Sequence, residues 1–197
     1  MKISWIISST VFVLENSKAE KMKNIALVGF MGTGKTTIAE LLASKLHGIY
    51  VDLDEKIEAK EGMVIVDIFL HKGESYFRKV EKDIVAEIAS GTGLIIACGG
   101  GVVLDEENIK NLKKNGFIIG LEATPEVILN RTKNYMHRPL LNIADPKSKI
   151  KDLLEKRKLY YAKADYSIDT SELSTQEVIV QILNWVEGQM SNESGTK

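Results

Sequence analysis

A glycine-rich segment followed by lysine and threonine gives the strongest chemical signal in the sequence. GFMGTGKTT, residues 29–37, fits the pattern G-x-x-x-x-G-K-[ST] of a phosphate-binding loop. Its backbone N–H groups can turn toward an anion, and the helix that follows adds the partial positive charge of its N-terminus. Lys35 is expected to reach the β- and γ-phosphates of a nucleotide, and the Thr36 hydroxyl to bind Mg²⁺. The complete motif argues against the alternative, a turn that binds nothing.

The loop does not identify the phosphate acceptor, because kinases, GTPases and ATPases share it. The guanine-recognition pattern N-K-x-D is absent from the sequence, which argues against a GTPase. A chain of 197 residues is also short for a motor ATPase. The acceptor must therefore be inferred from other residues.

Two aspartates follow an apolar run in YVDLD, residues 50–54. Open α/β sheets bind ligands at the carboxyl ends of their strands. If the strand continues, Asp52 and Asp54 point to the same side, and one could hold Mg²⁺ through water while the other binds a substrate hydroxyl. Taken alone, the pattern favours a different role, in which Asp54 caps a helix over residues 55–62.

Arg78 and Glu81 are three residues apart on an expected helix, so the glutamate could fix the guanidinium to receive an anion. The pair alone favours a surface ion pair. Gly99–Gly101 follow a buried strand, which suggests a backbone pressed against a ligand. That strand does not end in an aspartate, so Asp52 is the candidate for a second carboxylate near Mg²⁺.

Two further arginines lie in the second half of the chain. Arg138, in MHRPLL, belongs to a polar connection between two expected helices and could close over a transferred phosphate. Arg157 lies in LLEKRKLYY. Singly, either arginine would more often be a solvated surface residue.

Short apolar runs alternate with helical patterns, which predicts an α/β fold with a parallel sheet wrapped by helices. The expected strands cover residues 24–29, 49–53, 94–98, 117–121 and 166–168. The expected helices cover residues 35–46, 74–90, 106–115, 125–133, 148–163 and 175–190.

Composition favours one soluble domain. The net charge of −1 lacks the basic footprint of a nucleic-acid binder. The single cysteine, Cys98, excludes an internal disulfide and fits a reducing, cytoplasmic setting. The apolar stretch of residues 3–14 is too short to span a bilayer, so no membrane association is expected. It is either a weak signal peptide or part of a dispensable extension that precedes a true start at Met22, and the second is favoured.

Taken in order, GFMGTGKTT, D-L-D, F-R-K-V-E, C-G-G-G, R-P-L-L and K-R-x-x-Y-Y resemble the shikimate kinase family over about residues 23–186. The resemblance implies a three-layer α/β/α fold with five parallel strands in the order 2-3-1-4-5 and a lid at about residues 133–148. Residues 23–190 would form the domain, with an extension at 1–22 and a polar tail at 191–197. It implies transfer of the ATP γ-phosphate to the 3-hydroxyl of shikimate in aromatic amino acid biosynthesis, by a monomer with one Mg²⁺.

The resemblance also implies individual roles. On the ATP side, Asp52 would assist Mg²⁺ through water, together with Thr36, and Arg131 would lie near the adenine. The phosphates would be bound by Gly32, Thr33, Gly34, Lys35, Thr36, Thr37 and, from the lid, Arg138.

On the acceptor side, Asp54 would bind shikimate hydroxyls and orient or deprotonate the nucleophile. Arg78 and Arg157 would bind the carboxylate, with Glu81 positioning Arg78. Gly99–Gly101 would contact the substrate through backbone. Lys35, Asp54 and Arg138 would be the catalytic groups.

Two rival functions remain at this point. One is another small-molecule kinase on the same scaffold, such as a gluconate or adenylate kinase, since fold alone does not fix the substrate. The F-R-x-x-E pattern, the three glycines and the D-x-D pair favour a small hydroxy-carboxylate instead. The other rival is a non-catalytic nucleotide-binding regulator, which would have no use for an acceptor site.

Overall fold

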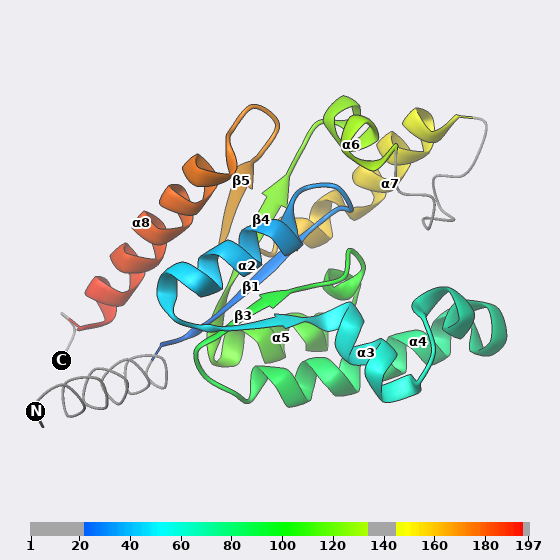
Figure 1. Ribbon diagram of the computed structural model, residues 1–197, viewed down its shortest axis with the longest axis horizontal. Coiled ribbons are helices and arrows are strands. Elements are labelled where there is room, and N and C mark those ends of the chain that lie inside the picture. The colour runs from blue at the N-terminus through cyan, green and yellow to red at the C-terminus, as the bar shows by residue number, and fades with distance from the viewer. Residues whose placement is uncertain (1–21, 134–144, 195–197) are drawn as a thin grey trace, which may run out of the picture.

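Five parallel strands form one sheet in the computed structural model, which describes residues 22–133 and 145–194. The order across the sheet is β2-β3-β1-β4-β5, as the resemblance implies (Figure 1). The strands are β1 (Asn24–Gly29), β2 (Ile49–Asp52), β3 (Leu94–Ala97), β4 (Gly116–Glu122) and β5 (Tyr166–Asp169).

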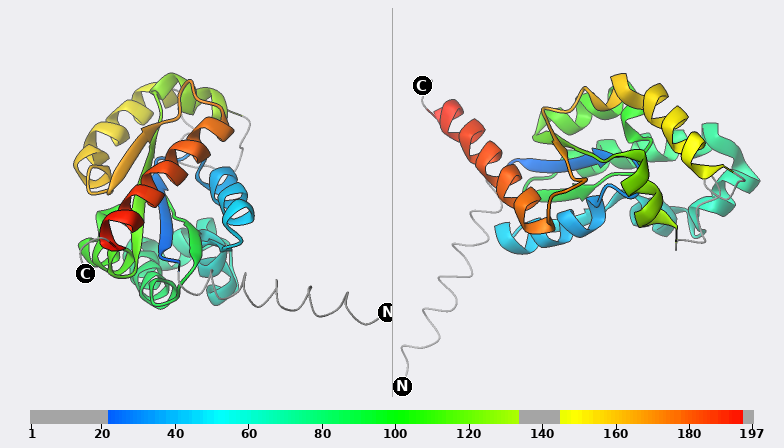
Figure 2. Two further views of the ribbon diagram at one scale, coloured as in Figure 1. Left: turned by 90° about the vertical axis from the view of Figure 1, so that its left-hand side faces the viewer. Right: turned by 90° about the horizontal axis from the view of Figure 1, so that it is seen from above.

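Helices cover both faces of the sheet and make three layers (Figures 1 and 2). On one face lie α2 (Lys35–Leu46) and α8 (Thr175–Ser194). The other face and its carboxyl edge are covered by α3 (Leu53–Glu61), α4 (Ile65–Ala89), α5 (Glu106–Lys114), α6 (Pro125–Thr132) and α7 (Pro146–Tyr161). A short 3₁₀ helix, η1 (Val102–Leu104), follows β3.

The central strand shows why the apolar runs are continuous. All six residues of β1 are buried. Ile25 and Leu27 pack toward α2 and α8, whereas Ala26 and Val28 pack toward the opposite cluster. Successive side chains of a strand point to opposite faces, so a strand covered on both sides must be apolar throughout. Central β1 thereby fixes the phosphate-binding loop at the carboxyl edge of the sheet.

Several expected boundaries differ from those in the structure. The strand expected at residues 49–53 ends at Asp52, and α3 begins directly afterwards. Helical structure also extends N-terminally of the expected helix 74–90, because α4 begins at Ile65. Its two halves meet at Gly73, whose φ of 80° and ψ of 169° are not helical. The helix α8 continues to Ser194, into the expected polar tail.

Other expectations fall on parts of the chain that lie outside the described residues. These are nearly all of the expected extension (1–22) and residues 134–144 of the expected lid, including Arg138. In the ranges 22–133 and 145–194, no helix is both long and apolar enough to cross a membrane.

Candidate active site

The phosphate-binding loop joins β1 to α2, and its glycines have backbone conformations that other residues rarely adopt. Gly32 has a φ of 79° and Gly34 a φ of 98°. A Cβ atom on Gly29 would lie only 2.2 Å from the carbonyl oxygen of Leu121. The ammonium of Lys35 donates a hydrogen bond of 2.9 Å to the carbonyl of Phe30, which folds its side chain back over the loop. The glycines thus shape the loop, as its sequence predicts.

The threonines of the loop divide into two kinds. Thr33 is only 1% exposed, and its hydroxyl donates a 2.8 Å hydrogen bond to the carbonyl of Phe30, so its side chain supports the loop from inside. Thr36 and Thr37, in the first turn of α2, are exposed. Their hydroxyls are therefore open to a ligand at the N-terminus of the helix.

Arg131 of α6 connects the loop with the segment that follows β5. Its guanidinium donates to the carbonyl of Thr170 at 2.6 Å and approaches that of Gly32 at 3.4 Å. A cavity of about 220 Å³ lies between these groups and α8, lined also by Leu173 and Val178. The arrangement suits a flat apolar base beside bound phosphates. Thr170 was not predicted as a site residue. It follows the last predicted strand, and this position indicates the carboxyl edge of the sheet, where ligands bind.

A larger cavity, of about 640 Å³, lies on the other side of the loop, between the end of β4 and α7. Thr33 is the only predicted site residue in its lining, which also carries Glu122, Lys151 and Lys158. The predicted acceptor-side residues line neither of these cavities, so they are located by their contacts with one another.

Asp52 is the cap of α3, and this corrects the expectation that Asp54 might be. The Oδ1 atom of Asp52 accepts hydrogen bonds from the backbone N–H of Asp54 at 2.9 Å and of Glu55 at 3.3 Å. Burial, reinforced by Asp52, raises the pKa of Tyr50, whose hydroxyl donates to Asp52 Oδ2 at 3.3 Å. The two aspartates are therefore not neighbours on one strand: Asp54 projects from the first turn of a helix.

The three glycines after β3 leave room for charged side chains. A Cβ on Gly99 would lie 2.6 Å from Asp54 Oδ1. A Cβ on Gly101 would lie 2.5 Å from each terminal nitrogen of Arg78. Gly100 lies beside the phosphate-binding loop, where its Cβ would be 3.6 Å from the carbonyl oxygen of Gly29. These glycines thus gather an aspartate, an arginine and the phosphate-binding loop around one short segment.

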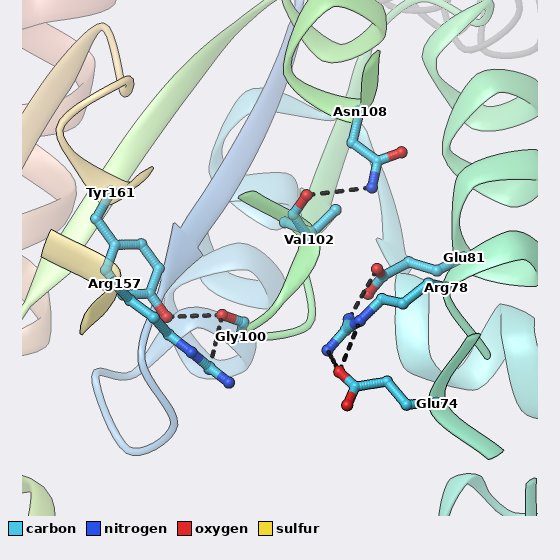
Figure 3. A network of polar contacts seen from close by, with 8 residues as sticks. All are labelled: Glu74, Arg78, Glu81, Gly100, Val102, Asn108, Arg157 and Tyr161. Atoms are coloured by element: carbon cyan, nitrogen blue, oxygen red, sulfur yellow. Dashed lines mark hydrogen bonds and ion pairs between the residues drawn. The ribbon is translucent and has the colours of Figure 1, made fainter. Parts of the chain in front are cut away.

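Arg78 and Glu81 form an ion pair whose carboxylate is buried, so the alternative of a surface pair is wrong. Arg78 Nη1 lies 2.9 Å from Glu81 Oε2, and Glu81 is 1% exposed (Figure 3). Burial raises the pKa of the Glu81 carboxyl, while Arg78 acts in the opposite direction. In the described part of the chain, Glu81 Oε1 has no hydrogen-bond partner. The guanidinium is therefore held by a carboxylate that water scarcely reaches.

Two side chains of α7 bind the same backbone oxygen. The carbonyl of Gly100 accepts hydrogen bonds from Arg157 Nη1 at 3.2 Å and from the Tyr161 hydroxyl at 2.7 Å (Figure 3). The predicted Arg157 therefore lies across Gly100 from Arg78, as Figure 3 shows. Tyr161 was not predicted as a site residue. Its spacing of four residues from Arg157 indicated a common helix face but no partner.

Cys98, directly after β3, is buried, as expected for a residue that packs in the sheet. Burial raises its pKa, so the group is a neutral thiol. It is therefore not a nucleophile of this site.

Comparison with known proteins identifies the family. A family model described as shikimate kinase matches residues 31–187. The chain belongs to the shikimate kinase family. It is 49% identical to a shikimate kinase of Thermodesulfovibrio yellowstonii over 82% of this chain and 94% of the relative. It is 47% identical to one of Caldanaerobacter subterraneus subsp. tengcongensis, over 82% of this chain and 95% of the relative.

A solved structure supports the same family. The shikimate kinase of Acinetobacter baumannii, in complex with shikimate, has a TM-score of 0.82 and 35% identity to this chain. The match covers 89% of this chain and 98% of that protein. The fold and the order of the strands predicted from the resemblance are thus confirmed.

Proposed function

We propose that this protein phosphorylates the 3-hydroxyl of shikimate with ATP, yielding shikimate 3-phosphate and ADP on the route to chorismate and the aromatic amino acids. Family membership supports this reaction. The observation that carries it is the segment Gly99–Gly101, which lies against Asp54 and Arg78, accepts a hydrogen bond from Arg157 and lies beside the phosphate-binding loop. An acidic group for hydroxyls, two cations for a carboxylate and a phosphate site thus lie around one backbone segment.

On the ATP side, we propose that Lys35 moves from the Phe30 carbonyl to the transferred phosphate, where it offsets developing charge. Gly32, Thr33, Gly34, Thr36 and Thr37 would bind the phosphates through backbone or hydroxyl groups. Arg131 would border the adenine, beside the cavity that Thr170 and Leu173 line. Arg138, which is not among the described residues, would bind the phosphates.

On the acceptor side, Arg78 and Arg157 would bind the shikimate carboxylate from opposite sides of Gly100. Planar guanidinium groups suit carboxylates, and the buried Glu81 restricts Arg78 to one orientation. Asp54 would accept hydrogen bonds from the substrate and orient or deprotonate the attacking hydroxyl. Phosphoryl transfer depends mainly on such positioning and charge neutralisation.

The residues present fit Mg²⁺ bound together with ATP. Thr36 and Asp52 offer hard oxygen ligands, and Mg²⁺ usually keeps several waters and binds substrate phosphates rather than an all-protein cage. The described residues contain no cluster of three or more histidine, cysteine or acidic side chains that could hold a metal by itself. Mg²⁺ would supply positive charge to the transferred group.

We also propose that residues 23–190 act as one catalytic domain, as a cytoplasmic monomer, and that residues 1–22 are dispensable for the reaction. The central experiment measures ADP release by the full chain and by a variant starting at Met22, with ATP and Mg²⁺. Shikimate is the test acceptor, and gluconate and AMP are controls. Turnover that requires shikimate in both proteins is expected. ATP binding without turnover on any acceptor would instead support a regulatory protein.

A further inference from the structure

A second carboxylate contacts Arg78, and the function proposed above does not account for it. Glu74 Oε1 lies 3.3 Å from Nε and 3.2 Å from Nη2 of the guanidinium (Figure 3). The side chain of Glu74 is 64% exposed, whereas that of Glu81 is 1% exposed. One carboxylate is therefore built into the core, and the other reaches Arg78 from the surface.

The contacts around the guanidinium leave one edge on which an incoming carboxylate can bind. Nη1 already donates to Glu81, and both terminal nitrogens lie against Gly101. The remaining edge, formed by Nε and Nη2, presents two N–H donors of the kind that bind a carboxylate. Glu74 occupies this edge. A substrate carboxylate and Glu74 would therefore need the same donors.

We propose that Glu74 is an internal competitor of the acceptor's carboxylate, occupying the Nε–Nη2 edge of Arg78 until the acceptor displaces it. The inference rests on the proposed role of Arg78 in binding that carboxylate. In atomic terms, Glu74 gives up its two N–H contacts, the acceptor carboxylate takes them, and the charge on Arg78 stays paired throughout.

The local structure lets Glu74 leave Arg78 at a small cost in free energy. Glu74 directly follows Gly73, where the helix α4 is interrupted. Nothing lies within 4 Å of a Cβ built on Gly73, so there is open space beside the interruption. Glu74 is the exposed partner of this ion pair, whereas the side chain of Arg78 is 25% exposed. A pair with one exposed partner near the surface contributes little free energy, because water hydrates the carboxylate once it leaves. Glu74 can thus leave for water.

Competition from Glu74 favours acceptors that carry a negative charge. An acceptor with a carboxylate replaces the contact that Glu74 loses, whereas a neutral polyol does not. The opposite role, in which Glu74 only orients Arg78 for the acceptor, predicts an effect of opposite sign. Removing an orienting group raises the KM for shikimate, and removing a competitor lowers it.

The test compares Glu74→Gln and Glu74→Ala with Glu87→Gln in the full-length enzyme. Glu87 is an exposed glutamate on the same helix, so its variant controls for the loss of one negative charge. We expect the Glu74 variants to lower the KM for shikimate about two- to fivefold, the range typical of an exposed ion pair. The kcat and the KM for ATP should stay unchanged, and the KM for shikimate methyl ester, which is neutral, should not fall.

A KM for shikimate that equals that of Glu87→Gln, or rises, would overturn the inference. The same substitutions in an Arg78→Ala background separate it from the function on which it rests. If Arg78→Ala raises the KM and Glu74→Gln then has no further effect, competition at Arg78 is supported. If Glu74→Gln still lowers the KM without Arg78, only the competition is refuted. If Arg78→Ala leaves the KM unchanged, both the carboxylate role of Arg78 and the inference fail.

Discussion

The hydroxyl of Tyr161 donates a 2.7 Å hydrogen bond to the carbonyl of Gly100, 61 residues away in the chain. This contact fixes the segment that also carries the neighbours of Asp54 and Arg78. The helix α7 is thereby joined to the glycines of the candidate active site.

Replacement of Tyr161 by Phe should therefore weaken the acceptor site without unfolding the protein. Loss of a net hydrogen bond predicts a stability decrease of about 1 kcal/mol. We expect a severalfold higher KM for shikimate and an unchanged KM for ATP, measured by steady-state kinetics. Tyr160→Phe is the matched control, because Tyr160 is 36% exposed and adjacent in the chain. Equal kinetics of the two variants would contradict a positioning role.

Replacement of Gly101 by Ala should act on Arg78 through steric exclusion. The φ of Gly101 is −105°, which alanine adopts freely, so the backbone is not strained. The new methyl group would lie 2.5 Å from both terminal nitrogens of Arg78 and must displace the guanidinium. We expect kcat/KM for shikimate to fall roughly ten- to a hundredfold, as for other misplaced binding groups. Gly188→Ala on α8, where the added Cβ meets nothing within 4 Å, should leave kcat/KM unchanged.

Replacement of Lys35 by Ala should abolish most turnover, because charge that develops on the transferred phosphate loses its partner. The expected loss in kcat is on the order of a hundred- to a thousandfold. Lys45→Ala removes an exposed lysine from the last turn of the same helix and should behave as wild type. Circular dichroism of both variants checks the fold. Near-normal turnover of Lys35→Ala would refute its role.

The buried Glu81 predicts a dependence of acceptor binding on pH. Because burial raises its pKa, Glu81 takes up a proton at a higher pH than an ordinary glutamate, and Arg78 then loses its charged partner. The KM for shikimate should rise on acidification before exposed carboxylates titrate. Glu81→Gln should have a raised KM that stays flat over this range. If the KM for shikimate rose equally at low pH in both proteins, Glu81 would be excluded as the titrating group.

The same group predicts the sign of a change in stability. A raised folded-state pKa means that the folded protein binds the proton more tightly than the unfolded chain does. The contribution of Glu81 to stability is therefore full below its unfolded pKa and is lost as pH rises through its folded pKa. Denaturant unfolding of wild type and Glu81→Gln across this range should show the loss in wild type alone. An identical pH dependence would contradict the assignment.

Local patterns predicted the parts of this site that depend on local chemistry. The loop at residues 29–34 requires positive φ angles that glycine adopts readily, and the glycines of the motif indicate this requirement directly. The strand order came from family resemblance, since apolar runs alone do not specify which strands are neighbours. The Arg78–Glu81 pair was visible as a helix spacing, but only the fold shows that its carboxylate is buried.

Other features could not be read from the sequence, because they depend on a single boundary or on distant partners. Whether Asp52 or Asp54 caps α3 is decided by where the helix begins, and a shift of two residues exchanges their roles. The first half of α4 was missed, and its exposed Leu70 and Val66 do not mark a buried face. The hydroxyls of Tyr161 and Thr170 donate hydrogen bonds to carbonyl oxygens that are far away in the chain, and no local pattern predicts such partners.

The buried thiol of Cys98 has a practical consequence for fluorescence work. It is the only cysteine of the chain and is 3% exposed. Because burial keeps it protonated, maleimide reagents should react with it slowly. Cysteines introduced at exposed positions of α3 and α6 can therefore carry a dye pair without removal of the native residue. Energy transfer between the dyes would then report how the acceptor side and the nucleotide side approach each other during turnover.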